Sequence, residues 1–400
     1  MSDQQEMEIE DEENQEEVDS DLEEDEEEAE DSSDDEPLEE KIFVPGTKTE
    51  ECDGELEVDE NAYILYHQVM LCPRDILSFN INLKASLGPP CLSFDIIHET
   101  CKYDFPLTVM GVAGTQASKV TANSLIAFRM SNLHSVRPVQ DDEDEDDVED
   151  PEEEKPVLKM SGLKHPGTVN RVKYAMIGPT PVVAAWSEAG SVGVWNLTSV
   201  LARLELPGQD GSREEASPLQ TFTGHSCEGY ALDWSQSDTG VLASGDCNKN
   251  IHVWKPGDNG QWSVSEKPYS SHTSSVEDIK WSPNEKTVMA SCSCDKTIKI
   301  WDIRADPGKA CMLTQGGAHT SDVNVIDWNR NEPFIVSGGD DGVVKVWDLR
   351  QFSGLSEPVA TFQHHSGPVT SVEWHPEDSS VFASSGEDHQ VWRNKLLPFL

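Results

Sequence analysis

Histidine and serine, two residue types that serve nucleophilic and acid–base catalysis, recur at regular spacing in this 400-residue chain. Four histidines lie 47, 47 and 46 residues apart: His225, His272, His319 and His365. A serine follows each of them by 18 or 19 residues: Ser244, Ser291, Ser337 and Ser384. A catalytic centre occurs once, whereas this pair occurs four times. We therefore expect a structural role and no enzyme.

Tryptophan and aspartate extend the repeated unit. A tryptophan follows each histidine within 30 residues: Trp254, Trp301, Trp347 and Trp392. A buried indole N–H needs an acceptor, and serine, histidine and aspartate can share hydrogen bonds with it. We therefore predict buried networks in successive units. Their members are His272, Ser291, Asp295 and Trp301, then His319, Ser337, Asp341 and Trp347, and also His225, Ser244 and Trp254 with Asn248 at the aspartate position.

The period of the units predicts the fold class. A unit of about 40 to 45 residues that runs from histidine to tryptophan is typical of a WD blade. Between these anchors, Thr297–Trp301 and Val343–Trp347 are short β-branched runs, and Asp341-Gly342 predicts a tight turn. The sequence thus predicts an all-β chain folded as a WD40 β-propeller. The clearest blades are His225–Pro256, His272–Arg304 and His319–Arg350.

The first half of the chain carries weaker signals. Strands expected at Leu92–Ile97, Leu107–Gly111 and Leu125–Met130 make the first blade. His165–Leu197 is a degenerate second blade that keeps Trp195 but has Ala184 and Ala189 at the serine and aspartate positions. The absence of that polar pair is expected to leave no group unpaired, and a linker over 202–218 follows. Asp59–Gln68 predicts a short amphipathic helix with Tyr63 and Tyr66 as apolar partner contacts.

The net charge of −47 is concentrated in two stretches. Residues 1–40 hold 24 acids and no base, and residues 141–154 hold 12 acids; without both runs, 40 acids face 29 bases, a charge of −11. Stretches this charged do not collapse, and they repel nucleic acid but attract basic proteins. A solubilising role is the alternative. The expected partner-binding acids are Asp141, Asp142, Glu143, Asp144, Glu145, Asp146, Asp147, Glu152, Glu153 and Glu154.

These patterns give three domains: a disordered acidic arm (1–40), a helix region (41–89) and a propeller (90–400) interrupted by the acidic loop (141–154). The nine cysteines show no zinc-ligand spacing, and no phosphate loop or nucleophile elbow is present. We therefore expect no metal, cofactor or catalytic residue. With no secretory signal and no apolar run of about 18 residues, we expect no membrane partner and a reducing compartment.

Several stretches closely resemble the glutamate-rich WD-repeat proteins, which are ribosome-assembly factors related to histone-binding WD proteins. They are Tyr63–His67, Pro90–Ile96, Gly229–Trp234, Asn250–Trp254, His272–Trp281, Lys309–Leu313 and Pro368–Pro376. The resemblance implies a seven-bladed propeller that acts in the nucleus and nucleolus. It also implies a scaffold or chaperone for a basic protein of the large ribosomal subunit, with histones as further partners.

The chain departs from the family pattern in two places. Residues 69–87 are an extra segment in which Leu77–Ile81 (LSFNI) nearly copies Leu92–Ile96 (LSFDI). After Gln390 the family pattern runs on into a further blade, whereas six blades are expected here and the C-terminal one is missing. An open ring would expose unpaired strand edges.

A second function remains open from the sequence. Trp301-Asp-Ile-Arg304 and Trp347-Asp-Leu-Arg350 look like the WDxR element of propellers that dock on a ligase adaptor. If Arg304 and Arg350 dock on that adaptor, the chain is a substrate receptor of a cullin-RING ubiquitin ligase. Alternatively, each arginine ends a blade strand and pairs with a nearby acid.

Overall fold

The computed structural model describes residues 64–65, 85–86, 89–102, 104, 106–133, 156–206, 211–257, 260–352 and 356–396. All of them belong to one compact unit within residues 41–400. The helices among them are too short to cross a bilayer, as α1, the longest, has seven residues.

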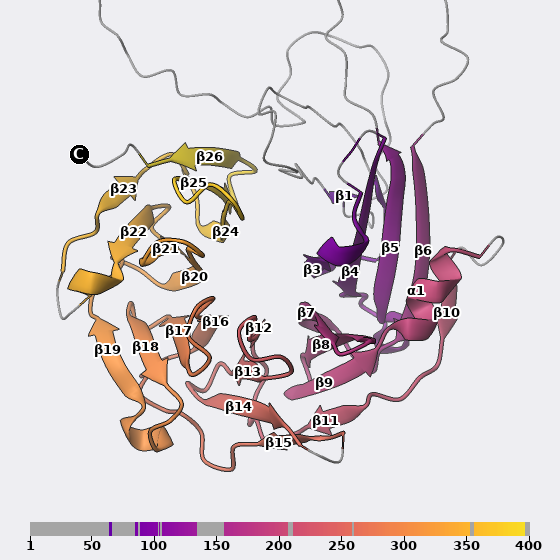
Figure 1. Cartoon of the computed structure of the whole chain (residues 1–400), viewed down its shortest axis with the longest axis horizontal. Coiled ribbons are helices and arrows are strands. Elements are labelled where there is room, and N and C mark those ends of the chain that lie inside the picture. Colours follow the sequence, from indigo (N-terminus) through magenta and orange to yellow (C-terminus); the bar gives the residue numbers. More distant parts are fainter. Residues whose placement is uncertain are drawn as a thin grey trace, which may run out of the picture. The chain divides into compact units, whose positions relative to one another are not determined.

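Six sheets, the blades, follow one another along the chain, as the sequence predicted, and all their strand pairs except one in blade one are antiparallel. Each begins with a strand near the centre of the ring and proceeds outward (Figure 1). Blade two contains β7 (Val169–Ile177), β8 (Thr180–Ser187), β9 (Ser191–Asn196) and β11 (Gln220–Phe222). Blade three contains β12 (Ala231–Trp234), β13 (Leu242–Gly245), β14 (Ile251–Pro256) and β15 (Trp262–Val264).

The later blades repeat this order. Blade four contains β16 (Val276–Trp281), β17 (Val288–Ser293), β18 (Ile298–Asp302) and β19 (Cys311–Gln315). Blade five contains β20 (Val323–Trp328), β21 (Phe334–Gly339), β22 (Val344–Asp348) and β23 (Ala360–Phe362). Blade six has three described strands, β24 (Val369–Trp374), β25 (Val381–Gly386) and β26 (Val391–Lys395). Short 3-10 turns η3 (Pro307–Lys309) and η4 (Leu349–Gln351) follow β18 and β22.

Blade one has five strands, including the three predicted ones. They are β3 (Cys91–Ile96), β4 (Leu107–Thr115), β5 (Ser124–Leu133), β6 (Val157–Lys164) and β10 (Ser212–Glu214), with η1 (His98–Thr100) and η2 (Val120–Ala122) in its loops. The prediction of a plain linker over 202–218 was wrong. Helix α1 (Thr198–Leu204) buries Val200 and Leu204, and β10 pairs in parallel with β6. The apolar face of this segment explains why it folds back onto the body.

The predicted helix over Asp59–Gln68 is also wrong at the two positions that the structure describes. Ile64–Leu65 form β1, which pairs antiparallel with β2 (Ala85–Ser86). A β-branched and a γ-branched residue between tyrosines suit a strand as well as a short helix, so the local pattern was ambiguous. The other eight residues of that stretch lie outside the described part of the chain.

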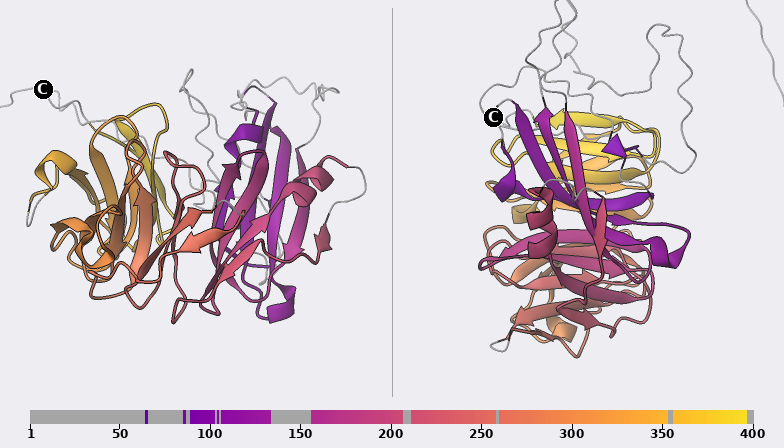
Figure 2. Two further views of the ribbon diagram at one scale, coloured as in Figure 1. Left: turned by 60° about the horizontal axis from the view of Figure 1, so that its bottom comes forward. Right: turned by 90° about the vertical axis from the view of Figure 1, so that its right-hand side faces the viewer.

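The cores lie between the blades, so each blade is stabilised by its neighbours. Trp254, Trp301 and Trp347 are fully buried there. The innermost strands of successive blades pack together from β3 to β7 and onward to β24. The side views in Figure 2 show the blades as twisted stacks of strands. Among the described strands, no comparable packing joins β24 of blade six to β3 of blade one.

Candidate functional site

The repeated polar residues of blade four form one continuous network. His272 contacts Ser291 Oγ through Nε2 at 2.7 Å and Asp295 Oδ2 through Nδ1 at 2.9 Å. Trp301 Nε1 donates to the same Ser291 Oγ at 2.8 Å. The network therefore ties the loop before β16 to β17, to the following turn and to β18.

The connectivity of Ser291, His272 and Asp295 is that of a catalytic triad, but its surroundings are those of a core. Ser291 is fully buried, and its hydroxyl already takes the indole N–H. A nucleophile must reach a substrate, and this hydroxyl cannot. The geometry holds the blade together instead.

The protonation states follow from the environment. Burial alone would raise the pKa of Asp295, but hydrogen bonds from His272, Thr297 and the Thr273 N–H outweigh it and hold the pKa well below its usual range. Burial lowers the pKa of His272 against the opposing effect of Asp295. The neutral imidazole then donates from Nδ1 to the carboxylate and accepts the Ser291 O–H at Nε2, so every group is satisfied.

Blades three and five contain the same arrangement. In blade five, His319 lies 2.8 Å from Ser337 and 3.0 Å from Asp341, and Trp347 donates to Ser337 at 2.9 Å.

Blade three corrects the prediction that Asn248 stands for the aspartate. His225 Nδ1 instead contacts Asp246 Oδ2 at 2.9 Å, while Nε2 contacts Ser244, which accepts from Trp254. Asn248 donates to Ser226 instead. Asp246 lies two residues before Asn248 in the chain. Its carboxylate nevertheless contacts Nδ1 of the histidine, the same nitrogen that Asp295 contacts in blade four.

Blade six uses a different residue in place of tryptophan. His365 contacts Ser384 at 3.0 Å and Asp388 at 3.1 Å, as in the other networks. Asn394 donates to Ser384 Oγ at 3.0 Å, whereas Trp392, which satisfies the histidine-to-tryptophan spacing, stacks on His364 at a centroid distance of 4.9 Å. The serine precedes its donor by ten residues in all four networks, so this spacing would have identified Asn394.

Blade two lacks the network and leaves one buried donor unpaired. Cross-strand register places Ala185, and not Ala184, at the serine position, because Val183 pairs with Trp195 as Met289 pairs with Trp301. Trp195 Nε1 is buried and has no partner among the described residues, contrary to the expectation that nothing would be unpaired. His165 contacts the carbonyl of Gly167 instead.

Restoring the missing hydroxyl should stabilise blade two. In Ala185→Ser we expect the new Oγ to accept the Trp195 N–H, which raises the free energy of unfolding by about 1 kcal/mol. Chemical denaturation measures the change. Ala184→Ser is the matched control, because Ala184 is equally buried but belongs to a different core cluster. Equal effects of the two substitutions would contradict the assignment.

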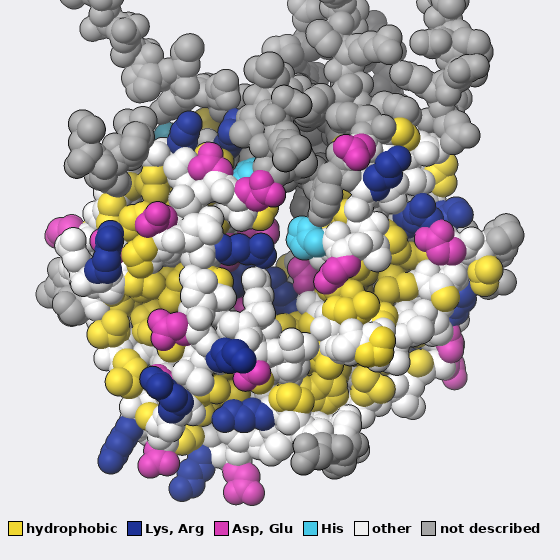
Figure 3. Space-filling view, in the orientation of Figure 1, with side chains coloured by type: hydrophobic (Ala, Val, Ile, Leu, Met, Phe, Trp, Pro, Cys, Tyr) yellow, Lys and Arg dark blue, Asp and Glu magenta, His cyan; other side chains and the backbone are white. Residues whose placement is uncertain are grey.

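A second set of polar residues, which no local sequence pattern indicated, lies on the innermost strands. Each lies directly before an aromatic or aliphatic residue of its strand. They are Asp95, Lys173, Asp233, Lys280, Asp327 and Glu373, one from each blade. Figure 3 shows charged side chains of both signs around the central opening. We call these six residues the channel ring.

Ion pairs and backbone hydrogen bonds link neighbouring members of the channel ring. Lys280 Nζ lies 3.1 Å from Asp327 and Lys173 Nζ lies 3.9 Å from Asp95. Asp95, Asp233 and Asp327 each accept the backbone N–H of the next blade's aromatic residue at 2.7 to 2.8 Å. These bonds fix the spacing of the innermost strands.

The enclosed channel also perturbs the acids. Burial raises the pKa of Asp233 to about 6 against the opposing charges of Lys280 and Lys173. Desolvation by the surrounding protein raises the pKa of Glu373, and the negative charges of Asp327 and Asp95 raise it further. The side chain itself is exposed to the channel. Burial alone would lower the pKa of Lys280, but the charges of the surrounding carboxylates, Asp327 first, outweigh it and raise the pKa, so Lys280 stays charged.

Arg304 and Arg350 occupy equivalent positions after the third strands of blades four and five. Each guanidinium contacts the aspartate two residues earlier, with Nε of Arg304 2.9 Å from Asp302 and Nε of Arg350 2.9 Å from Asp348. The side chains remain 73% and 65% exposed. They are held in place and still accessible.

The predicted partner-binding residues, Tyr63, Tyr66 and the acids of 141–154, lie outside the described residues. The structure does define where the acidic loop is attached. It joins β5 to β6, the third and fourth strands of blade one, and Ser131 pairs with Val157 at that end. The two strands that flank the loop in the sequence are therefore paired neighbours within blade one.

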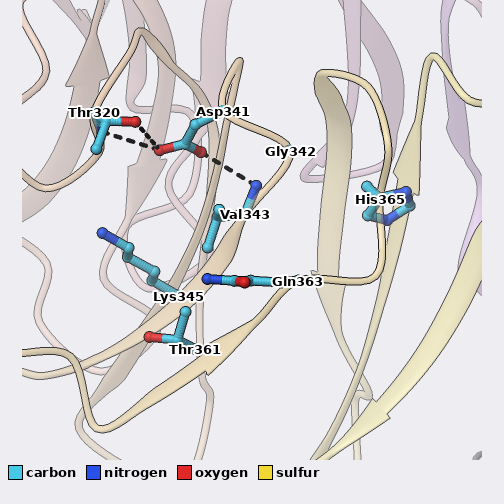
Figure 4. A pocket seen from close by; sticks show the side chains of 8 residues that line it. All are labelled: Thr320, Asp341, Gly342, Val343, Lys345, Thr361, Gln363 and His365. Carbon is cyan, nitrogen blue, oxygen red and sulfur yellow. Dashed lines mark hydrogen bonds between the residues drawn. The ribbon is translucent and has the colours of Figure 1, made fainter. Parts of the chain in front are cut away.

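One pocket of about 530 Å³ lies between blades five and six and is lined by Thr320, Asp341, Gly342, Val343, Lys345, Thr361, Gln363 and His365 (Figure 4). Asp341 accepts from Thr320 and the Val343 N–H, and Lys345 donates to the Ala318 carbonyl. The charged groups of this pocket are thus engaged within the blade. Elsewhere in the described ranges, no group of three His, Cys, Asp or Glu side chains is placed to hold a metal ion.

The WD domain, G-beta repeat family matches residues 216–255, 263–302, 310–348 and 356–392, which cover blades three to six. With the six sheets, these matches define the chain as a WD-repeat β-propeller.

Similar proteins bear out the resemblance to the glutamate-rich WD-repeat group. The chain is 38% identical over 254 residues to glutamate-rich WD repeat-containing protein 1 of Dictyostelium discoideum, covering 60% of this chain and 48% of that protein. It is 36% identical over 263 residues to Protein HEAT STRESS TOLERANT DWD 1 of Arabidopsis thaliana (60% and 52%). It is also 36% identical over 243 residues to Ribosome assembly protein rrb1 of Schizosaccharomyces pombe (59% and 46%). The chain thus spans about half the length of these curated relatives.

Proposed function

We propose that this chain is a non-enzymatic scaffold and chaperone in assembly of the large ribosomal subunit, acting in the nucleus and nucleolus. Its partner is a basic ribosomal protein, and histones are a second class of basic partner. Similarity to a protein named for ribosome assembly supports the pathway. The attachment of 12 acids within residues 141–154 to two paired strands supports the chemistry of the partner.

The acidic loop acts by concentrating cationic protein at the propeller. The loop holds 12 acids in 14 residues, and the strands that precede and follow it pair with each other in blade one. Opposite charges accelerate encounter and discourage competing anions such as RNA. The propeller supplies a rigid body on which the bound protein is kept apart from nucleic acid.

Binding should therefore depend on loop charge and on salt. In the variant we replace the ten acids named above and Glu149 and Asp150 by their amides, which keeps loop length. We expect at least a tenfold loss of affinity for a basic ribosomal protein at 50 mM salt, because Coulomb attraction is lost. The loss should shrink at 500 mM, where the screening length is only about 4 to 5 Å. Titration by fluorescence anisotropy measures both.

A matched variant with the 24 acids of residues 1–40 amidated separates the loop from the arm. Unchanged affinity in the loop variant at low salt would overturn the role of the loop. Replacing the ribosomal protein by core histones tests the second partner class.

Docking on a ligase adaptor is a second candidate, favoured by the exposed, pre-positioned pair Arg304 and Arg350. Their planar guanidinium groups keep donors free beyond the aspartate contacts. Co-purification of an adaptor that disappears in Arg304→Ala/Arg350→Ala but persists in the neighbouring exposed Arg330→Ala would support it. Loss of basic-protein binding in the same double variant would instead assign the arginines to the scaffold function.

A further inference from the structure

The turns between the second and third strands of blades three and six have the same backbone. Lys249 and His389 both adopt the left-handed conformation, with φ of 64° and 62°, and each lies 24 residues after the histidine of its blade's network. Two residues before each of them, a backbone N–H donates to the carbonyl of the third residue after that histidine. These bonds run from Cys247 to Glu228 and from Glu387 to Pro368, each at 2.9 Å. Distances in one turn therefore apply to the other.

This equivalence places Cys227 directly opposite Cys247. Their counterparts in blade six are Gly367 and Glu387, and a Cβ atom at Gly367 would lie 3.6 Å from the Cβ atom of Glu387. The Cβ atoms of disulfide-bonded cysteines are about 3.5 to 4.5 Å apart. The two cysteines of blade three are therefore spaced for a disulfide bond.

The contacts of Cys227 agree with this placement. Its sulfur accepts hydrogen bonds from the backbone N–H groups of Cys247 and Asn248. Next to it, Asn248 Nδ2 donates to Ser226 Oγ at 3.1 Å, so the loop and the turn lie against each other. Both cysteines are half-buried and their thiols are free. A small oxidant can therefore reach two sulfur atoms that are already close together.

Blade four provides a contrast within the same chain. Cys294 occupies the position of Cys247, 22 residues after the histidine of its blade, but the residue opposite is Ser274. The Cys294 thiol instead donates to Glu277 Oε1 at 3.2 Å. Among the described turns, blade three alone has cysteine at both positions.

We propose that Cys227 and Cys247 are a redox modification site, which a peroxide oxidises to a disulfide and a dithiol reduces again. One thiolate attacks a peroxide oxygen, the O–O bond breaks, and water leaves, so that a sulfenic acid forms. The second thiol attacks that sulfur, the S–S bond forms, the S–O bond breaks, and a second water leaves. Hydrogen peroxide thus accepts two electrons, and both thiol protons end in water.

The surroundings of the pair keep it reduced until the oxidant is abundant. Burial, and then the charge of Asp246, raise the pKa of Cys227 against the two N–H groups that it accepts. Burial also raises the pKa of Cys247, and the charges of Glu277 and Glu228 add to this effect against one hydrogen bond. Only the thiolate reacts with peroxide, so oxidation is slow at neutral pH and becomes faster as the pH rises.

The disulfide fastens the loop that enters blade three to the turn after β13. The same loop contacts blade two, because Asn170 donates to Glu228 Oε2 at 3.0 Å and Arg171 donates to the Tyr230 carbonyl at 2.8 Å. A cross-link at Cys227 therefore restricts the segment that joins the two blades. Oxidation stiffens this junction.

Peptide mapping of the full chain by mass spectrometry tests the proposal. The reduced chain is treated with hydrogen peroxide, its remaining thiols are alkylated, and it is digested without reductant. We expect a linkage between Cys227 and Cys247 that dithiothreitol removes and that forms about tenfold faster at pH 8.5 than at pH 7.5. Cys294 should stay unlinked in the same sample. In Ser274→Cys, a second linkage between position 274 and Cys294 should appear, because blade four then has the same pair.

Hydrogen exchange measures the effect on the junction, with Cys247→Ser as the control. Amides 226–231 should exchange about tenfold more slowly in the oxidised chain than in the reduced one. Peroxide should leave their exchange unchanged in Cys247→Ser. Absence of the linkage between Cys227 and Cys247 at pH 8.5 would overturn the proposal, and so would linkage of Cys227 mainly to another cysteine. A linkage that leaves exchange unchanged would overturn the stiffening of the junction.

Discussion

Replacing Lys280 by methionine is expected to lower the free energy of unfolding at pH 7.5 by about 3 to 5 kcal/mol, because it leaves partly buried acids without their cation. Lys280 and Asp327 are only 19% and 15% exposed and lie 3.1 Å apart. Asp233 and Glu373 also lose the attraction that lowers their pKa values. Urea denaturation measures the change.

The deficit should shrink in acid. A carboxyl whose pKa is raised in the folded state contributes stability below its unfolded pKa, near 4, and loses it as the pH rises through the folded value. For Asp233 that value is about 6, and without Lys280 it moves higher. The stability of the variant should therefore approach that of the wild type as the pH falls from 7.5 to 5. Protonation of His272 below about pH 6.5 also destabilises the fold, but it affects both proteins alike.

Lys286→Met in the same blade is the matched control, since this side chain is exposed and makes no ion pair with a described residue. We expect it to change stability by less than about 0.5 kcal/mol. A pH-independent deficit in Lys280→Met would mean that packing of the aliphatic stem, and not the charge of the ring, carries the effect.

The contrast between the two polar systems explains what the sequence could reveal. The histidine networks lie within one blade, so His272, Ser291 and Trp301 recur at nearly constant spacing and were predicted. The channel ring joins one residue from each blade, and Asp95 and Glu373 are 278 positions apart. Its members meet only when the ring forms, so no local period marks them as a set.

The errors have equally local causes. Trp392 satisfied the histidine-to-tryptophan spacing, but strand register places Asn394 opposite Phe382, where the donor must lie. Asp246 reaches His225 from a turn that is built differently from the Asp295 turn, which no spacing rule anticipated. The segment after blade two was read as a linker because its charged residues mask the buried Val200 and Leu204 of α1.

Replacing Ser291 by alanine should also destabilise the chain strongly, by about 2 to 4 kcal/mol, because two buried groups lose their partner at once. Trp301 Nε1 loses its acceptor and His272 Nε2 loses its donor. Ser263→Ala on the exposed position of β15 is the control and should be nearly neutral.

A double-mutant cycle isolates the hydrogen-bond contribution. Trp301→Phe removes the indole N–H, so it should cost less in the Ser291→Ala background, where that group is already unsatisfied, than in the wild type. We expect a coupling energy of about 1 kcal/mol or more, measured by chemical denaturation of the four proteins. Strict additivity would show that Ser291 and Trp301 contribute independently, and would reduce the network to simple packing.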